Sequence, residues 1–415
     1  MSSHHQAIEK HFQESDEPSR SSAGILLLIL GIIFIGMNLR APLTSVGPLV
    51  GMIRDDLGIS NTLAGMLTTL PLLAFAFVSP FAPKLARRFG INAVVLASLP
   101  ILTLGIILRS VSGIGTLFLG TALLGFAISI CNVLLPSLIK QEFPLRIGFM
   151  TGIYSVAMNL CGAIASGISI PLSTDFGLGW KVVLGCWAIP AFLSLLVWLP
   201  QARNRHKQMI AVKSDRKNEP VNVWRSRLAW KVTIFMGLQS LMFYIIVAWM
   251  PEILIERGLS ASSSGWMLFL LQFALLPFTF IIPVIAGRMS NQRLLVIITF
   301  LLFVVGYLGL LFGGNLLIPV WAILIGIGGG CAFSLSMMFF SLRTQNVHQA
   351  AELSGMAQSV GYLLAAIGPT LFGLLHDMTH SWTLPLFIMV VASALLLIVG
   401  FGAGSNQYVT SKEKN

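Results

Sequence analysis

One arginine lies deep inside the first long apolar run of the sequence. Arg40 is about sixteen residues into this run, which corresponds to roughly 24 Å of helix. A charge at that depth is costly in lipid and normally faces a cavity or a partner. Pro42 and Pro48 follow, and each removes a backbone N–H donor and tends to break the helix. A guanidinium beside freed carbonyl groups predicts a substrate-binding role for Arg40; snorkelling to the membrane surface and a structural pairing are the alternatives.

Acidic residues are absent from the middle of every long apolar run, which narrows the class of solute. A carrier of cations would need a buried carboxylate as ligand and proton carrier. An unmatched guanidinium instead favours an anion, or a neutral solute with strong acceptors such as a nitro group. The acids at the ends of the runs are Asp55, Asp56, Asp175, Glu252, Glu256, Glu352 and Asp377.

Two residues are candidates for coupling transport to protons. A proton and an anion bound at Arg40 could travel together. Glu252, directly after Pro251, is the alternative carrier, and it could equally be a solvated acid at a helix end.

Further polar residues inside the runs are predicted to fill out the same substrate site. Gln358 and Tyr362 are four residues apart and therefore share one helix face, as do Gln239 and Phe243. For each residue taken singly, a hydrogen bond between helices is the alternative. The predicted substrate-binding set, besides Arg40, is Asn38, Thr44, Asn132, Tyr154, Asn159, Gln239, Tyr244, Gln272, Gln358 and Tyr362.

The sequence offers no pattern typical of catalysis or of a cofactor. The glycines at 326 and 328–330 lie in an apolar run with no Lys-Ser/Thr after them, so they predict close helix packing and not a nucleotide loop. The four cysteines lack metal-type spacing, and the seven histidines form no ligand pattern. We expect no catalytic residues, no metal, no cofactor and no enzyme activity.

Composition identifies the class of protein. Of 415 residues, 56% are hydrophobic and only 10% are charged, against about 25% charged in ordinary globular proteins. The net charge of +11 does not indicate nucleic-acid binding, because the basic residues lie in short segments between apolar runs. The chain is predicted to be an integral membrane protein.

Twelve apolar segments are long enough to span a bilayer as helices. Alternating segments typical of a membrane β-barrel are absent from the sequence. The predicted spans are 23–50, 61–83, 91–111, 114–138, 148–172, 178–199, 228–251, 263–286, 292–313, 316–341, 352–375 and 382–403.

The distribution of basic residues predicts the orientation. With the N-terminus in the cytoplasm, 21 of the 26 Lys and Arg residues fall on the cytoplasmic side, as the positive-inside rule requires. We therefore expect both termini, 1–22 and 405–415, in the cytoplasm, and a cytoplasmic linker at 201–227. The five basic residues left for the outer side or the spans are Arg40, Arg54, Arg109, Lys181 and Arg257.

The two halves of the chain are related by an internal repeat. A shift of 200 residues produces nine identities in 36 positions between 53 and 88, including Gly58/Gly258 and Pro83/Pro283. Two halves in the same orientation are parallel repeats about an axis along the membrane normal, and they can rock around a central cavity. In this register the counterpart of Arg40 is Ser240, so the charge is unmatched.

This architecture resembles the major facilitator superfamily. The superfamily's motif between helices 2 and 3 fits at Leu85-Ala86, Arg88 and Gly90, whereas Pro83 replaces its glycine and Arg87 replaces its aspartate. That replacement removes the acid on which a gating salt bridge would depend. The stretches Asn38–Leu49, Leu67–Ala76, Asn132–Pro136 and His348–Ala366 resemble the cyanate and 2-nitroimidazole transporter branch. This resemblance covers nearly the whole chain and implies small polar or anionic solutes.

We therefore predict an all-α membrane protein with 12 transmembrane helices in two pseudo-symmetric six-helix bundles, 23–200 and 228–404. The predicted function is secondary active transport of a small anionic or acceptor-rich solute, nitroimidazole-like or cyanate-like, by alternating access and linked to protons. A broader exporter, an uncoupled facilitator, a membrane enzyme and a non-transporting sensor are the alternatives. The expected partners are the solute, the lipid bilayer and protons, without nucleic acid, for a monomer in the cell membrane.

Overall fold

A computed structural model describes residues 22–59, 61–111, 113–202 and 222–409. Within these ranges all regular secondary structure is helical. Eleven helices are long and apolar enough to cross a membrane, and a bent pair makes up to twelve. The predicted all-α membrane fold is therefore confirmed. Most of the predicted tails and of the 201–227 linker lie outside the described residues.

The helices follow from long apolar runs whose backbone must satisfy its own hydrogen bonds in lipid. The first half contains α2 (Ser22–Asn38), α3 (Ala41–Thr44), η1 (Gly47–Leu49), α4 (Val50–Leu57), α5 (Asn61–Val78), α6 (Ala82–Phe89), α7 (Ile91–Arg109), α8 (Ile114–Glu142), η2 (Pro144–Arg146), α9 (Ile147–Thr174), α10 (Gly179–Gly185) and α11 (Ala188–Ala202). The second half contains η3 (Val223–Arg225), α13 (Arg227–Glu256), α14 (Ala261–Arg288), α15 (Arg293–Phe312), η4 (Asn315–Leu317), α16 (Ile318–Leu342), α17 (Val347–Thr379) and α18 (Thr383–Ala403).

The first span is broken where its prolines predict. α2 ends at Asn38, and the short α3 then begins directly after Arg40 with Pro42 in its first turn. The 3₁₀ turn η1 contains Pro48, and α4 completes the span. Proline lacks the N–H that a continuous helix would use at these positions. The break gives the backbone around Arg40 an irregular path.

The second predicted span, 61–83, differs from the structure. α5 ends at Val78, and α6 follows at a bend of 54°. Pro83 lies in the first turn of α6, where a missing N–H costs nothing. The motif residues 85–88, expected in a loop, are therefore helical. Elsewhere, polar flanks extend the helices: α13 runs to Glu256 and α17 begins at Val347.

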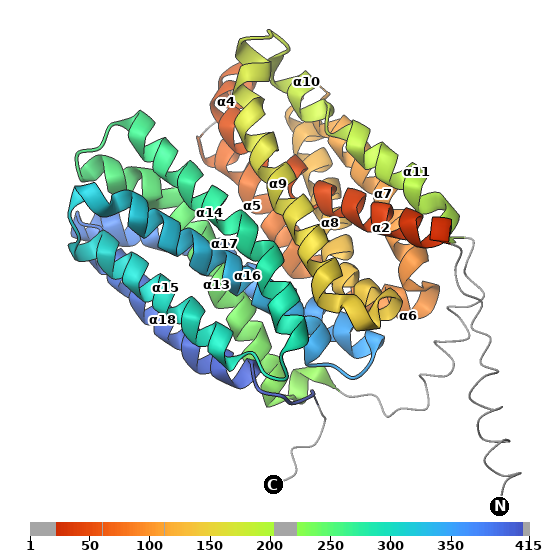
Figure 1. The fold of residues 1–415 in the computed structure, drawn as a ribbon. Coiled ribbons are helices and arrows are strands. Elements are labelled where there is room, and N and C mark those ends of the chain that lie inside the picture. The colour runs from red at the N-terminus through yellow and green to blue at the C-terminus, as the bar shows by residue number, and fades with distance from the viewer. Residues whose placement is uncertain (1–21, 60, 112, 203–221, 410–415) are drawn as a thin grey trace, which may run out of the picture.

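The helices form two bundles. Figure 1 shows α2–α11, coloured red to yellow-green, and α13–α18, coloured green to blue, as two groups. The hydrophobic cores divide in the same way, with one large cluster centred on each group. The repeat register is visible in the backbone: Gly58 and Gly258 both follow a helix end, with φ of 62° and 92°. Glycine adopts this left-handed conformation without a Cβ penalty.

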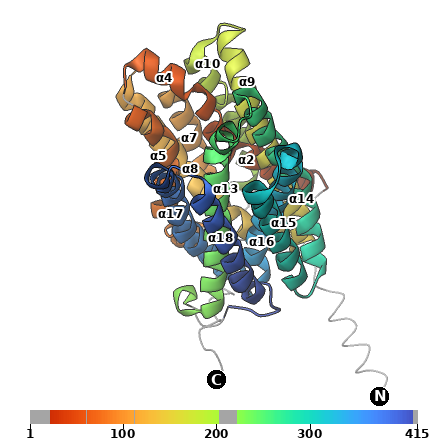
Figure 2. The same ribbon diagram turned by 90° about the vertical axis from the view of Figure 1, so that its left-hand side faces the viewer.

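The two bundles are joined by polar contacts at one end, which we call the basic end because Lys84, Arg87, Lys140 and Arg343 lie there. Arg87 Nη1 lies 2.6 Å from Glu352 Oε1 of α17, and Lys140 Nζ donates to the Ser341 carbonyl at 2.8 Å. Burial lowers the pKa of Arg343 to about 10, which still leaves it charged at neutral pH. In Figures 1 and 2, α4 and α10 lie together at the other end of the molecule.

Candidate functional site

A cavity of about 500 Å³ lies between the bundles. We call it the large cavity. The first bundle contributes residues 40–48, part of α5 and α9, and the ends of α7 and α8; the second contributes parts of α13, α14 and α17. Arg109 is the last residue of α7, a helix that follows α6 at the basic end, and the α17 residues, 366–370, lie in the second half of a helix that begins near Glu352. The large cavity is therefore on the side away from the basic end.

A second, smaller pocket of about 30 Å³ adjoins the large cavity, with room for only about one or two water molecules. The two spaces share Arg40, Phe243, Tyr244 and Leu275 in their walls. Ser240, the repeat counterpart of Arg40, lines this small pocket too. Arg40 therefore lies where the two spaces meet, near the axis that relates the bundles.

Arg40 is held by contacts from α9 and α13. Its guanidinium donates to the side-chain oxygen of Asn159, while the Asn159 amide nitrogen donates to the Ser155 carbonyl at 2.8 Å. The guanidinium carbon lies 4.7 Å from the centre of the Phe243 ring, a cation–π contact. Its methylene stem passes over Gly162, which has no side chain to obstruct it. Asn159 and Phe243 together direct Arg40 into the cavity rather than toward lipid.

The charged side chains of this site are all basic. The walls of the large cavity contain two charged side chains, Arg40 and Arg109. Among the described residues that line either space, there is no Asp or Glu. Twelve of the other 26 lining residues are leucine, valine, alanine or phenylalanine, and threonine, proline and glycine supply most of the rest. Such a site can bind a solute with a negative or acceptor-rich group and an apolar body.

The structure brings together seven of the predicted substrate-binding residues. Five line the large cavity and two line the small pocket beyond it. Thr44 also donates to the Gly162 carbonyl at 2.8 Å, which ties α3 to α9. The large-cavity residues are Arg40, Thr44, Asn159, Tyr244 and Gln272, and those of the small pocket are Gln239 and Tyr362.

Asn38 lies outside both linings. Its amide nitrogen donates to the Ser194 hydroxyl at 2.8 Å and to the Pro190 carbonyl at 3.2 Å. Both partners belong to α11, within the first bundle. Asn38 therefore joins two helices of one bundle, which is the alternative stated for each polar residue.

Gln358, Asn132 and Tyr154 also lie outside the two linings. Gln358 is buried and donates to the backbone carbonyl of Asn132 at 3.1 Å, across the bundle interface. Tyr154 is 2% exposed and packs in the core of the first bundle, against Gly36. These three residues lie close to the site without lining it.

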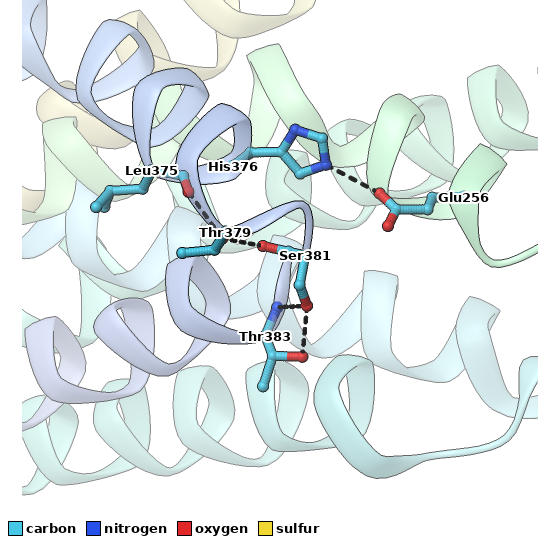
Figure 3. Close-up of polar contacts among 6 residues, drawn as sticks. All are labelled: Glu256, Leu375, His376, Thr379, Ser381 and Thr383. Carbon is cyan, nitrogen blue, oxygen red and sulfur yellow. Dashed lines mark hydrogen bonds and ion pairs between the residues drawn. The ribbon is translucent and has the colours of Figure 1, made fainter.

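Glu252, the candidate proton carrier, is exposed and is absent from the lining of the large cavity. Glu256, four residues later on α13, accepts from His376 of α17 at 3.2 Å. Figure 3 shows this pair beside the turn that joins α17 to α18, where Thr379, Ser381 and Thr383 hydrogen-bond to one another. This acidic end of α13 therefore points toward α17 and the α17–α18 turn.

Sequence reasoning did not assign a role to Arg109 or to Phe243. Arg109 is the last residue of an apolar run, and an arginine there is indistinguishable by sequence from one that snorkels to the interface. Phe243 shares a helix face with Gln239, but a phenylalanine in an apolar run carries no distinguishing signal. Ser166 and Thr370, which also line the large cavity, are small polar residues that are common in membrane helices.

Comparison with known proteins identifies the family. The sequence model of the Major Facilitator Superfamily matches residues 25–369 and 232–414. The chain belongs to the major facilitator superfamily. Solved structures of the superfamily share this fold: the proton:xylose symporter XylE superposes with a TM-score of 0.73 at 13% identity, covering 94% of this chain and 98% of that one. The fucose:proton symporter FucP of Escherichia coli gives 0.68 at 13%, covering 91% and 98%.

Curated members of the superfamily are similar over almost the full length. The uncharacterized transporter YycB of Bacillus subtilis is 47% identical, covering 93% of this chain and 96% of the relative. The 2-nitroimidazole transporter of Escherichia coli is 40% identical, covering 94% and 98%, and its cyanate transport protein CynX is 28% identical, covering 90% and 94%. The resemblance to the cyanate and 2-nitroimidazole branch is thus confirmed. The chain is a multi-pass membrane transporter and not an enzyme.

Proposed function

We propose that this chain is a secondary active transporter that moves a small anionic or acceptor-rich solute by alternating access. One observation carries the proposal: Arg40 lies where the large cavity meets the small pocket, and no carboxylate is among the described residues of either wall. A desolvated guanidinium without an acid binds planar acceptor groups in a bidentate way. Carboxylate and nitro groups present such a pair of oxygens, whereas cyanate is linear and offers its negative charge and one terminal acceptor at a time.

The relatives support this choice of cargo. Two of them are named for 2-nitroimidazole and for cyanate; the first carries a nitro group and the second is a small anion. Both solutes fit a site with one hydrogen-bond fork and an apolar wall. We accordingly propose a nitroimidazole-like or cyanate-like solute for this chain. A broader exporter with the same binding site is the alternative.

The basic end suggests how the transporter sits in the membrane. The positive-inside rule favours a cytoplasmic position for that end and for both termini. The bundles contact each other there, whereas the large cavity lies on the far side. Under this orientation the conformation is outward-facing, and Arg40 is reached from outside the cell.

The first prediction concerns Arg40. Arg40→Ala should abolish uptake of labelled cyanate and of 2-nitroimidazole into proteoliposomes, because the charge and the hydrogen-bond fork are both lost. Arg40→Lys should retain a small part of the uptake, because an ammonium keeps the charge without the planar geometry. Arg88→Ala is the control, since Arg88 lies over Phe89 of its own helix, outside the cavity. Full uptake by a folded Arg40→Ala protein would remove the proposed binding site.

The second prediction concerns coupling. We expect an imposed pH gradient to drive solute uptake against its own concentration gradient in proteoliposomes, with Arg40 or Glu252 as the residue involved. Glu252→Gln should leave this response unchanged if proton and anion travel together at Arg40. A solute flux that ignores the pH gradient would indicate a facilitator, and binding without any flux would indicate a sensor.

A further inference from the structure

We propose that Arg109 is a second anion-binding residue of the large cavity, so that the solute is held at two points. This inference rests on the proposed function and adds to it a chemical requirement. The solute would carry one anionic group and a second acceptor on an apolar body, as a small aromatic acid does. Arg40 and Arg109 would each take one of the two acceptor groups.

Arg109 is buried with most of its hydrogen-bonding capacity unused. The residue is 1% exposed. Its Nη1 donates to the Pro42 carbonyl at 2.7 Å, whereas its Nε and Nη2 have no hydrogen-bond partner within the described chain. Among the described residues, no carboxylate forms an ion pair with Arg109. A buried, unpaired charge is destabilising, and buried donors without a partner indicate an acceptor that another molecule supplies.

The position of Arg109 is fixed by its helix. It is the last residue of α7, and α8 packs so closely there that a Cβ on Gly120 would lie 2.3 Å from the Arg109 backbone nitrogen. Arg109 and Thr121 of α8 both line the large cavity. Arg109 is therefore a fixed part of the cavity wall and not a mobile surface residue.

The two arginines flank the same short helix. Arg40 is the residue directly before α3, and Arg109 holds the carbonyl of Pro42 inside α3. A solute in the large cavity thus lies beside two cations separated by one turn of backbone. Leu43, in that turn, contributes apolar surface to the same wall. This arrangement fits a solute that presents acceptor groups at two points.

A purely structural role makes a different prediction. If Arg109 served only to hold the Pro42 carbonyl, a neutral donor would suffice. Arg109→Gln keeps such a donor and removes the charge. Arg109→Lys keeps the charge and one donor but loses the planar fork. Because the two variants remove different properties, they separate anion binding from support of α3.

The experiment measures binding of sodium 4-nitrobenzoate, which carries an anionic group and a second acceptor, to the purified full chain. Sodium benzoate is the matched ligand that lacks the second acceptor. We expect Arg109→Gln to raise the Kd for 4-nitrobenzoate at least about tenfold, equivalent to about 1.4 kcal/mol, so that the variant binds it no more tightly than benzoate. Arg109→Lys should raise the Kd for 4-nitrobenzoate about threefold to fivefold. Melting temperatures without ligand verify folding, and if Arg109→Gln does not fold, Arg109→Lys decides.

Each outcome has a distinct meaning. If the folded variants bind 4-nitrobenzoate as tightly as the unaltered chain, Arg109 only supports α3 and the inference is wrong, while the proposed function stands. If the unaltered chain binds neither ligand, the anionic cargo of the proposed function fails together with the inference. If Arg40→Ala, with Arg109 intact, also weakens binding of 4-nitrobenzoate, the two-point site is supported.

Discussion

At the scale of single residues, the site depends on the absence of a side chain at Gly162. A Cβ at this position would lie 3.1–3.3 Å from the Cβ, Cγ and Cδ atoms of Arg40. The Arg40 stem would have to move by a few tenths of an ångström, and its guanidinium would then leave the position set by Asn159. Small displacements of a binding group carry large penalties when the geometry is bidentate.

We therefore predict that Gly162→Ala weakens solute binding about tenfold, or about 1.4 kcal/mol, without unfolding the protein. The measurement is the Kd for 2-nitroimidazole in detergent solution. Gly167→Ala on the same helix is the matched control, because a Cβ there would meet nothing within 4 Å. Equal affinities for the two variants would mean that the exact position of the Arg40 stem is unimportant.

Sequence indicates how deep a residue lies in the membrane, but not the direction in which its side chain points. The depth of Arg40 in its apolar run predicts a cavity beside it, and Arg40 lines the large cavity. Asn38 is in the same predicted substrate-binding set. Residues two positions apart in a helical sequence point in directions about 200° apart, and Asn38 faces α11 instead of the cavity. For Gln358, helix periodicity gave the correct face, but the small pocket is lined by Tyr362 and does not reach Gln358.

At the scale of elements, the bundles meet most closely where α9 crosses α14. A Cβ on Gly148 would lie 2.2 Å from the Pro283 carbonyl oxygen. Pro283 belongs to the other bundle, so this close contact joins the two bundles near the basic end. Backbone atoms cannot yield as a flexible side chain can, so an added methyl group must separate the helices.

Gly148→Ala should consequently shift the protein away from this conformation, toward one with the basic end open. The measurement is the distance between spin labels placed on the two bundles at that end, which should lengthen in a larger fraction of molecules. Gly265→Ala, on α14 in open space, should leave the distribution unchanged. An unaltered distribution in Gly148→Ala would mean that α9 and α14 stay in contact throughout transport.

Element boundaries were predictable where apolar composition determines them and not elsewhere. Hydropathy located the spans because lipid excludes unsatisfied backbone. The helix α6 was missed because its basic residues, Arg87 and Arg88, give it no apolar run. The break in the first span was predicted correctly, since proline chemistry is local and does not depend on the rest of the fold.

At the scale of the whole molecule, Arg87 and Glu352 connect the two bundles. Their side chains are 46% and 21% exposed, so water screens the pair and its contribution is at most about 1 kcal/mol. An arginine replaces the superfamily's aspartate at position 87, so a salt bridge that depends on that aspartate is not expected. The structure shows a different ion pair there, in which Arg87 is the basic partner and Glu352 of α17 supplies the acid.

We predict that Arg87→Glu alone slows transport through like-charge repulsion with Glu352, and that the double variant Arg87→Glu with Glu352→Arg restores most of it. Initial rates of uptake in proteoliposomes measure both effects, and a double-mutant cycle isolates the coupling. If the double variant is as slow as the single one, the pair has no part in joining the bundles. No sequence argument would have paired positions 265 residues apart.

The groups that we propose bind the anionic part of the solute all belong to the first bundle. Arg40, Asn159 and Arg109, together with the broken helix they hold, belong to the first bundle, whereas Phe243, Tyr244 and Gln272 come from the second. During rocking, the cargo would stay docked on the first half while the second half supplies a moving wall. In chimaeras that exchange second halves between relatives, the preference for anions should therefore follow the parent that supplies the first half. The selectivity for the shape of the solute should depend on both parents.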